Sequence, residues 1–462
     1  MNAPAPITPT LLRLSLEDAR LRPRANNAYA RLLVEAHRAL DDGNVPRDER
    51  RVWIVPGRIE VLGKHVDYAG GRSLLCAAER GIVLVARARV DNTLIVRDAR
   101  RREALSLPFG KVPQGSLPWT VYPRTVVRRL LHNFGHTLLG ADVAIASNLP
   151  PAAGVSSSSA LIVGLTLAMA SLSDLPSLPQ WAAGIPDRTA LAGYIGALEN
   201  GADFGVLAGE RGVGTMGGAQ DQTAILCSSP GQLDMFSWAP VQHEQSVPWP
   251  SDYIFAIGVS GIIAAKTGAA KERYNRVART AHRLVALWNE THGAGARTLA
   301  ESFVQAGGGA RGDEIPARLL DAAQRGADDE FTATQLEARL RQFHAEAFEL
   351  VHGAADALER RDLVLFGDLV ERSQRGAEQA LGNQIAETVH LVEYARELGA
   401  VASSSFGAGF GGSVWAMVRA DEADRFLGQW RDRYLQTHPG ATHRAQFFTS
   451  APGAPAFEMK QE

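Results

Sequence analysis

Cysteine is almost absent from this chain, which has two cysteines in 462 residues. Cys76 and Cys227 lie far apart in the sequence, and neither belongs to a Cys-x-x-Cys pair. The sequence therefore offers no disulfide framework and no structural zinc site. Such sparse cysteine usage is typical of a reducing compartment, and we expect a cytoplasmic protein.

Long apolar runs and an excess of one charge sign are missing as well. The apolar run from Leu161 to Ala170 is far too short to cross a bilayer. The N-terminus lacks the basic region and apolar core of a signal peptide. The 48 Lys and Arg residues nearly balance the 50 Asp and Glu residues. We therefore expect neither a nucleic acid nor a membrane as a partner.

The length and composition indicate a soluble protein of two or three domains. Apolar residues make up 45% and charged residues 21% of the chain, which is ordinary for a globular protein. A chain of 462 residues is too long for one compact core. Because a proline-rich stretch at 240–250 is typical of a domain junction, we predict an N-terminal domain over residues 1–250 and a C-terminal domain over 251–462.

Hydrophobic periodicity predicts both helices and strands. The alternation at 82–96, with a turn at Asp91 and Asn92, predicts a β-hairpin. A helix over 16–40 is expected to break or restart at Pro23. Further helices are predicted at 189–200, 264–290, 334–360, 363–381 and 387–398, and further strands at 51–55, 143–146, 253–259 and 414–418.

A run of four serines, Ser156 to Ser159, precedes an uninterrupted apolar helix pattern. Pro150 and Pro151 keep the preceding chain extended or turning, and Gly154 permits a close backbone approach. A helix start with N–H groups, hydroxyl side chains and no carboxylates suits an anion, and phosphate is the obvious guest. The alternative is a serine-rich linker beside a buried helix. No Gly-Lys-Ser/Thr follows, so this is not a Walker loop.

A loop of unusual polar content is predicted at Pro56 to Gly71, directly after a strand. Arg58, His65 and Asp67 lie in it between glycines, which favours a site on one concave wall over a charged surface loop. For Lys64 alone, the surface alternative is favoured. Asp221 follows a dense glycine cluster and precedes an apolar run, so it is a candidate catalytic carboxylate, with a helix-capping Asp as an equal alternative.

The segment Gly407 to Gly412 has the Gly-x-Gly-x-x-Gly spacing of a dinucleotide-binding loop. A Rossmann loop leaves a strand and opens a helix, whereas this segment is expected to leave a helix and open a strand. Asp203-Phe204-Gly205 spells the DFG triplet of protein kinases, but no His-Arg-Asp is present. We therefore reject both interpretations.

Three of these segments match a known set of motifs in order. Gly57, Arg58, Gly63, His65, Asp67, Tyr68 and Gly71 match Gly-Arg-x-x-x-x-Gly-Glu-His-x-Asp-Tyr-x-x-Gly; Gly154 to Ser158 match Gly-Leu-Ser-Ser-Ser with Val155 for Leu; and Gly407 to Gly412 match Gly-Ala-Gly-Phe-Gly-Gly. Asp221 and Gln222 correspond to an Asp-Gln pair of a substrate loop. The chain thus resembles the GHMP small-molecule kinases, and among them the galactokinases.

The resemblance implies a two-domain α+β fold with the active site in the cleft between the domains. The N-terminal domain would be an α/β domain of ribosomal-protein-S5-like type, and the C-terminal domain a ferredoxin-like α+β domain. The implied cofactors are ATP and Mg²⁺, and the implied partner is a small-molecule sugar. A monomer or a weak homodimer is expected.

The resemblance also implies a role for each matching residue. Asp221 would take the proton from the anomeric hydroxyl, and Arg58 would keep that carboxylate ionised and offset charge on the moving phosphoryl group. Ser158 and Glu199 would bind Mg²⁺. The other implied roles are ATP binding for Gly154, Val155, Ser156, Ser157 and Ser158, an adenine pocket lined by Trp119 unless it is a core residue, sugar contacts for Lys64, His65, Asp67, Gly218 and Tyr274, and a cleft wall of Gly407, Gly409, Gly411 and Gly412.

One departure from the motif affects the substrate. The implied activity is phosphorylation of galactose at its anomeric hydroxyl. In the family motif, a Glu accepts a hydrogen bond from the C6 hydroxyl of the sugar, and Lys64 replaces that Glu here. The ammonium group of a lysine cannot accept a hydrogen bond. A uronic acid or a pentose such as arabinose is therefore an alternative substrate. Lys64 could instead turn to a neighbouring carboxylate, and galactose would then still bind. We favour galactose as the substrate. A non-catalytic sugar and ATP sensor is the alternative of another class.

Overall fold

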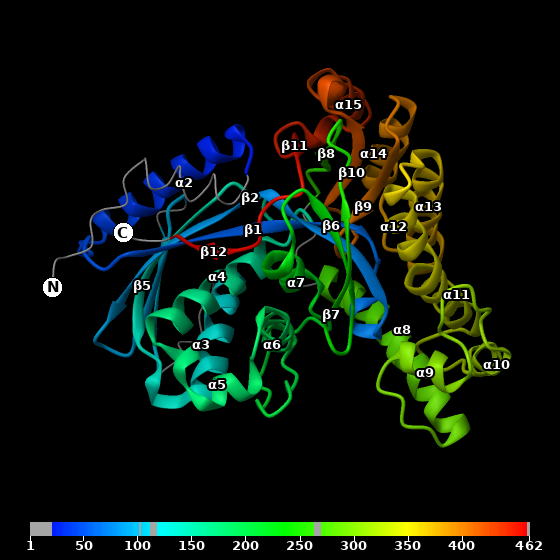
Figure 1. Ribbon diagram of the computed structural model, residues 1–462, viewed down its shortest axis with the longest axis horizontal. Helices are drawn as coiled ribbons and strands as arrows, with labels where there is room; N and C mark the ends of the chain where they lie inside the picture. Colours follow the sequence, from blue (N-terminus) through cyan, green and yellow to red (C-terminus); the bar gives the residue numbers. More distant parts are fainter. Residues whose placement is uncertain (1–20, 101–102, 111–117, 263–268, 460–462) are drawn as a thin grey trace.

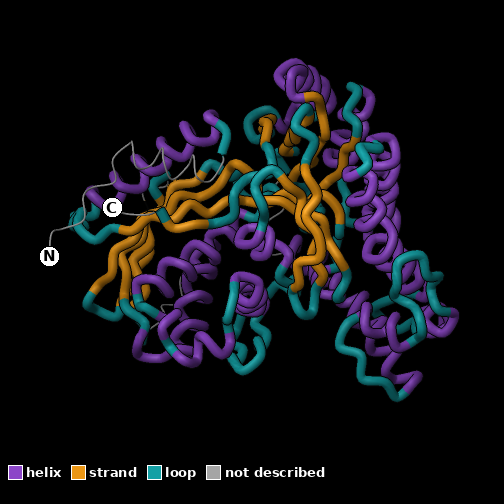
Figure 2. The backbone as a smooth tube through the Cα atoms, in the orientation of Figure 1, coloured by secondary structure: helices purple, strands orange, loops and turns teal. Residues whose placement is uncertain are grey.

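The computed structural model describes residues 21–100, 103–110, 118–262 and 269–459, which form two β-sheets with helices packed against them (Figure 1, Figure 2). The strand order of the first sheet is β12-β1-β2-β5-β3-β4, with β6 beside β2 and β7 beside β6. The order of the second sheet is β11-β8-β10-β9. Only the β3–β5 pair is parallel among the strand pairs described.

The strands and helices of the described chain have the following bounds. The strands of the first sheet are β1 (Arg51–Leu62), β2 (Arg72–Arg89), β3 (Thr93–Asp98), β4 (Glu103–Pro108), β5 (Gly140–Ser147), β6 (Gln232–Ser237), β7 (Gln242–Pro248) and β12 (Phe457–Glu458). Those of the second are β8 (Tyr253–Val259), β9 (Ala402–Phe406), β10 (Ser413–Arg419) and β11 (Gln446–Ser450). The helices are α2 (Pro23–Asp42), α3 (Val121–Phe134), α4 (Ser157–Leu172), α5 (Pro179–Gly184), α6 (Arg188–Asn200), α7 (Gln220–Cys227), α8 (Ala269–His292), α9 (Leu299–Gln305), α10 (Ala317–Arg325), α11 (Ala333–His344), α12 (Val351–Glu359), α13 (Leu363–Gly376), α14 (Ala386–Glu397) and α15 (Ala423–Thr437).

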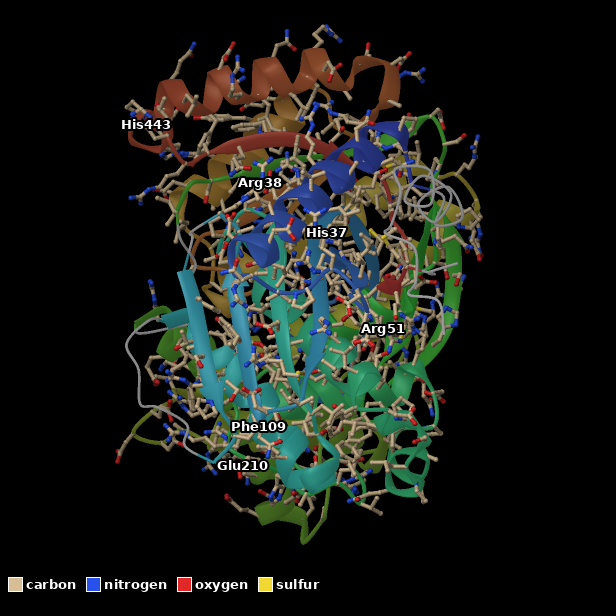
Figure 3. All side chains as sticks on the ribbon, turned by 90° about the vertical axis from the view of Figure 1, so that its left-hand side faces the viewer. His37, Arg38, Arg51, Phe109, Glu210 and His443 are labelled. Atoms are coloured by element: carbon tan, nitrogen blue, oxygen red, sulfur yellow. The ribbon has the colours of Figure 1, made fainter. Side chains whose placement is uncertain are left out.

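Strand β1 of the first sheet is buried on both of its faces, to which successive side chains point in turn. Val52 and Ile54 of β1 pack with α2, and Trp53 and Val55 pack in the main core with α4. Figure 3 shows α2, which carries the labelled His37 and Arg38, lying across the strands. This arrangement explains why the start of β1 reads as a continuous apolar run.

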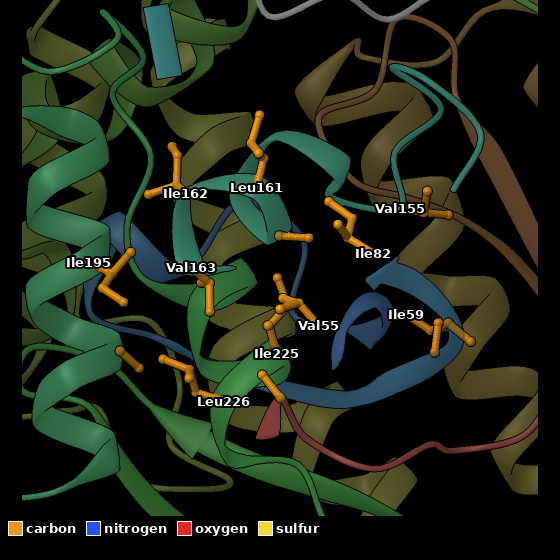
Figure 4. Packing of buried hydrophobic residues seen from close by; sticks show 14 of the residues in the cluster. Val55, Ile59, Ile82, Val155, Leu161, Ile162, Val163, Ile195, Ile225 and Leu226 are labelled. Atoms are coloured by element: carbon orange, nitrogen blue, oxygen red, sulfur yellow. The ribbon is translucent and has the colours of Figure 1, made fainter. Parts of the chain in front are cut away.

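Helix α4 is the central helix of the main core. Its residues from Ser159 to Ala170 are buried except at Leu167, so it is apolar on nearly all sides, as a helix enclosed by protein must be. Figure 4 shows Val163 of α4 between Ile195 of α6 and Val55 of β1. The core thereby fixes where α4 begins, which is at the serine run.

The second sheet is also covered on both faces. Ile254, Ala256 and Val414 pack with α14 and α15, whereas Phe255 and Trp415 point to the opposite face, toward α13. The sheet therefore joins the main core on one side only. The proposed boundary at 250/251 stays a prediction, but β12 returns from the end of the chain to pair with β1 of the first sheet.

The predicted hairpin at 82–96 is wrong. Both segments are strands, β2 and β3, but β5 lies between them, antiparallel to β2 and parallel to β3. Alternation of apolar residues identifies a strand and its buried face, but it does not identify the strand's neighbour. β5 is buried along nearly its whole length, which accounts for its place inside the sheet.

Two predicted loop contexts also differ from the structure. The loop predicted at Pro56 to Gly71 begins later than expected, because β1 continues to Leu62. The pairing of β1 with β2 shifts register at Pro56/Arg58 and Glu60/Leu62. The segment Gly407 to Gly412 leaves strand β9 rather than a helix. Strand β9 was not predicted because it begins Ala-Ser-Ser-Ser and so lacks an apolar pattern. Its serines are nevertheless buried, and the hydroxyls of Ser404 and Ser405 donate hydrogen bonds to the Gln374 side chain.

The remaining predicted elements are present with shifted ends. Among the described residues, the helix predicted over 16–40 is α2, which starts at Pro23, where a proline at the first helical position costs no hydrogen bond. The parts of the predicted helices at 16–20 and 264–268 lie outside the described residues. None of the helices in the described ranges is long and apolar enough to cross a membrane.

Candidate active site

A cleft of about 600 Å³ lies where the three motifs meet. It is bordered by the middle of β1, the start of α4, the start of α7 and the β9–β10 loop, segments far apart in the sequence. The predicted residues that line it are Arg58, His65, Asp67, Trp119, Gly154, Ser156, Ser157, Ser158, Glu199, Gly218, Asp221, Tyr274, Gly407, Gly409 and Gly411. Lys64, Val155 and Gly412 do not line it.

Arg58 and Asp221 form a buried ion pair at the centre of the cleft. The Arg58 Nε donates to Asp221 Oδ1 at 2.8 Å, and its NH1 donates to the Gly154 carbonyl at 2.5 Å. The two side chains are only 4% and 13% exposed. Arg58 is held by β1 and Asp221 by the first turn of α7, so regular structure fixes the pair in place. Asp221 is thus held as a charged acceptor facing the cleft.

Ser159 links two carboxylates beside this pair. Its Oγ lies 2.9 Å from Glu199 Oε2 and 3.1 Å from Asp221 Oδ2, and the hydroxyl has one hydrogen to donate. Gln222 Nε2 donates to the same Glu199 oxygen at 2.6 Å. The sequence-based assignment omitted Ser159, although it is the fourth member of the serine run. Two carboxylates and a hydroxyl at one point form an oxygen-rich group suited to Mg²⁺.

The start of α4 has the features predicted for an anion site. Its first turn consists of serines without an acidic residue, and Ser156 before it adopts a left-handed backbone with φ of 60°. Main-chain N–H groups and the positive end of the helix dipole therefore face the cleft next to Arg58. Val155 supports this loop through its carbonyl, which accepts a hydrogen bond from the Arg58 N–H at 3.3 Å.

The serine loop and the β9–β10 loop are packed backbone against backbone. Ser413 Oγ donates to the Ala153 carbonyl at 2.5 Å, and a Cβ added at Gly154 would lie 2.7 Å from the Phe406 carbonyl oxygen. Gly412 contributes through its own main chain, which bonds to Ser260 and Ile262. The loops that follow β5 and β9 therefore meet through their main chains and the small Ser413 side chain.

We expect Gly154→Ala to damage ATP binding. Its φ is +76°, and the added Cβ would press on the Phe406 carbonyl, so the serine loop must shift. The expected result is a rise of roughly tenfold in KM for ATP, the effect of losing a well-placed anion contact, together with a lower Tm. Steady-state kinetics and thermal unfolding measure both.

Gly205→Ala is the matched control. Its φ is also positive, at +53°, but nothing lies within 4 Å of the added Cβ. It should cost about 1 kcal/mol of backbone strain and leave KM for ATP unchanged. Equal behaviour of the two variants would contradict the proposed role of the Gly154 contact.

The opposite wall of the cleft carries polar groups from the first motif. Asp67 Oδ2 accepts hydrogen bonds from the N–H groups of Gly218 at 3.0 Å and Gln220 at 3.4 Å. Burial and the nearby Asp221 charge raise the pKa of Asp67. His65 is held by the Tyr68 hydroxyl at 3.0 Å and the Ala408 carbonyl at 3.2 Å, which joins the first motif to the third.

Tyr274 of α8 closes this wall. Its ring lies 5.3 Å from the His65 ring, and burial raises the pKa of its hydroxyl well above the usual value. A Cβ added at Gly218 would lie 2.7 Å from Asp67 Oδ2, so glycine at this position allows the two segments to approach. The wall presents hydroxyl, imidazole and carboxylate groups, which suit a polyhydroxylated ligand.

Lys64 turns away from the cleft to a neighbouring carboxylate. Its side chain is 3% exposed, and its Nζ donates to the Ser405 carbonyl and lies 3.8 Å from Glu60 Oε1. Burial lowers the pKa of Lys64, while the Glu60 and Glu346 charges oppose that shift. Glu60, by contrast, lines the cleft. Sequence reasoning missed Glu60 because its position is variable in the motif.

The cleft also has apolar lining. Trp119 and Tyr122 line it together with Ile82 and Leu149. The arrangement is suited to a flat, partly apolar group next to the anion site. Trp119 is half-buried and packs on the edge of the main core, so its two predicted roles do not exclude each other.

Family models match three parts of the chain. The galactokinase galactose-binding signature matches residues 43–88, the GHMP kinase N-terminal domain matches residues 121–229, and the GHMP kinase C-terminal model matches residues 354–436. Together these ranges cover just over half of the chain. The chain belongs to the GHMP kinase family. The predictions of a GHMP kinase fold and of a phosphotransferase enzyme are thereby confirmed.

Individual relatives of this GHMP kinase are galactokinases. The galactokinase of Roseiflexus sp. (strain RS-1) is 26% identical over 390 residues, which are 84% of this chain and 88% of that protein. The galactokinase of Streptomyces coelicolor is 35% identical over 182 residues, 39% of this chain and 42% of that protein. The crystal structure of Lactococcus lactis galactokinase complexed with galactose has a TM-score of 0.73 at 21% identity and covers 91% of this chain and 98% of its own. That structure supports the fold.

Proposed function

We propose that this GHMP kinase is a galactokinase, which transfers the γ-phosphoryl group of ATP to the anomeric hydroxyl of D-galactose. The observation that carries the proposal is the Arg58–Asp221 pair, at 2.8 Å, beside an anion site at the start of α4. The match of the galactose-binding signature to residues 43–88, which include Arg58, His65 and Asp67, supports galactose as the acceptor.

The chemistry assigned to the pair is a proton and phosphoryl transfer. Asp221 accepts the proton of the anomeric hydroxyl, the sugar oxygen bonds to the γ-phosphorus, and the bond from that phosphorus to the bridging oxygen breaks to release ADP. Arg58 keeps Asp221 ionised before the step and offsets charge on the moving phosphoryl group during it. The main-chain N–H groups of Gly154 to Ser158 hold the phosphates.

ATP and Mg²⁺ are the proposed cofactors, and the residues at the start of α4 suit both. Glu199 and Ser158, with Ser159 between Glu199 and Asp221, would hold Mg²⁺, which commonly binds one or two carboxylates plus substrate phosphates. Bound there, the ion would neutralise charge on the phosphates. We retain a monomer or weak homodimer as the expected state of the enzyme, and the cytoplasm as its compartment.

A neutral sugar is favoured over a uronic acid. Lys64 directs its ammonium to Glu60 and Ser405 rather than into the cleft. The charged group that does line the cleft at this point is Glu60, a carboxylate that would repel the carboxylate of galacturonate or glucuronate. An active enzyme is favoured over a sugar sensor because both Asp221 and the serine run are in place.

The test is ADP release by the purified protein with Mg-ATP and D-galactose, D-galacturonate, D-glucuronate or L-arabinose. We expect turnover with D-galactose at a kcat/KM at least tenfold above that with either uronate, and NMR of the product should place phosphate on the anomeric carbon. Turnover with uronates alone would overturn the substrate assignment. Sugar binding without turnover of any sugar would favour a sensor.

A further inference from the structure

Three buried side chains from one helix face bind the main chain of the first motif. Arg339 and Gln342 belong to α11, and Glu346 belongs to the π-helix Ala345–Leu350 that continues it. Residues three and four positions apart lie on the same side of a helix. All three side chains contact the turn Gly63 to His65, which directly follows β1. We call these three side chains the main-chain clamp.

Glu346 and Gln342 hold the first two residues of this turn. Glu346 Oε1 accepts hydrogen bonds from the N–H groups of Gly63 at 2.7 Å and Lys64 at 3.1 Å. Gln342 Nε2 donates to the Lys64 carbonyl at 3.2 Å. The π-helical turn that carries Glu346 is a rare element, which is frequent at functional sites. Two donors and one acceptor of the main chain are therefore held by side chains of a helix distant in the sequence.

Arg339 holds the third residue of the turn, and it is a buried cation. Its NH2 donates to the His65 carbonyl at 2.5 Å, and its NH1 donates to Gln342 Oε1. No carboxylate of the described residues forms an ion pair with Arg339, which is 1% exposed. A buried charge without such a partner is costly. Its charge opposes the rise in pKa that burial gives the Tyr68 hydroxyl, the group that contacts the His65 ring at 3.0 Å. Arg339 therefore supports both the main chain and the ring of His65.

The residue at the end of the clamp has an unfavourable backbone conformation. His65 is left-handed, with a φ of 56°, which a residue with a side chain keeps only where its surroundings fix it. Its ring lines the cleft, lies 5.3 Å from the Tyr274 ring and bonds to the Ala408 carbonyl. A shift of the main chain at His65 would therefore move this wall of the cleft.

We propose that Arg339, Gln342 and Glu346 are positioning residues, which hold His65 in its left-handed conformation and so set the cleft wall that faces the sugar. This rests on the proposed function. None of these three described residues lines the cleft, so they act through His65 and not by touching a ligand. All three also lie outside the ranges that the family models match.

The experiment is a double-mutant cycle of Arg339→Met with His65→Ala, followed by steady-state kinetics with D-galactose and ATP. Methionine fills much of the volume of the arginine but cannot donate to the His65 carbonyl. In the wild-type background, we expect Arg339→Met to lower kcat/KM for D-galactose about 10- to 100-fold, the scale for a misplaced site residue, and to change KM for ATP by less than about twofold. In the His65→Ala background, the same exchange should cost no more than about twofold, because the residue that it positions is gone.

Two further variants keep the test independent of the folding of Arg339→Met. Gln342→Met removes the donor to the Lys64 carbonyl and should show the same dependence on His65. Arg339→Lys keeps a cation that can donate to the His65 carbonyl, so it should recover part of the activity. Losses of equal size in the two backgrounds, or an unchanged kcat/KM, would overturn the positioning role.

Arg341→Met is the matched control. Arg341 lies on the same helix, but its side chain is 55% exposed and pairs with Glu337. The exchange should leave all kinetic constants unchanged, because an exposed ion pair contributes little.

The two proposals fail in different ways. Wild-type turnover of D-galactose tests the proposed function by itself. If wild type phosphorylates none of the sugars, that function is wrong, and amide hydrogen exchange of the full chain without ligands, followed by mass spectrometry, still tests the clamp. The segment 62–68 should exchange faster in Arg339→Met and Gln342→Met than in wild type, because its main chain is less firmly held. Equal exchange of this segment in all three proteins would reject the clamp.

Discussion

Asp221→Asn is expected to lower kcat by at least about 10²-fold, the usual scale for a positioned general base. The amide is nearly isosteric and can still accept a hydrogen bond from Ser159, so the start of α7 should keep its structure. It cannot take up the proton of the sugar hydroxyl. KM for both substrates should change little, because the sugar contacts proposed for Asp67 and Tyr274 do not involve the exchanged group.

Steady-state kinetics with D-galactose and ATP, and calorimetric binding of the sugar, measure this separation of kcat from affinity. Asp368→Asn, an exposed position on α13, is the control for the chemical change itself and should leave all constants unchanged. Near-normal turnover of Asp221→Asn would remove Asp221 from its role as base.

Arg58→Met should lower kcat by on the order of 10²-fold or more, and it should also raise KM for ATP. The methionine fills much of the same volume but removes the cation that contacts Asp221 and the donor that binds the Gly154 carbonyl. It leaves Asp221 without this cation and the serine loop without one anchor. Under the proposed mechanism, both catalysis and phosphate binding would therefore depend on this side chain.

Arg58→Lys separates these effects. A lysine retains the charge but cannot bind Asp221 and Gly154 at once with the fixed geometry of a guanidinium. Activity between those of wild type and Arg58→Met is the expected outcome of parallel kinetic assays. If Arg58→Met alters thermal stability but not kcat, then Arg58 serves the fold and not the reaction.

The motifs were readable from the sequence because each is local. The serine run before an apolar helix pattern predicts the start of α4, which the structure confirms, because a helix start depends on adjacent residues. The anion site at this start stays a proposal. The long helices and the strands β5, β8 and β10 were found for the same reason. The convergence of Arg58 with Asp221, 163 positions apart, came from the family resemblance and not from any pattern within the chain.

Long-range features could not be read in this way. The placement of β5 between β2 and β3 depends on which strands pair, and the alternation of apolar and polar side chains along a strand does not identify its neighbours. Glu60 and Ser159 look unremarkable in sequence, because their significance lies in Lys64, Gln220, Glu199 and Asp221 around them. The sequence shows that Lys64 replaces the Glu of the motif. The direction of its side chain depends on neighbours that are distant in the sequence, and the sequence does not predict it.

The return of β12 to the first sheet has a consequence for synthesis of the chain. Glu458 pairs with Trp53, and its carboxylate binds Arg51 at 2.6 Å, across 407 positions. While the ribosome is still making the second half, the outer edge of β1 has no partner, and a free strand edge invites pairing with other chains. The first sheet can therefore close only near the end of translation, and nascent chains are exposed to misassembly until then.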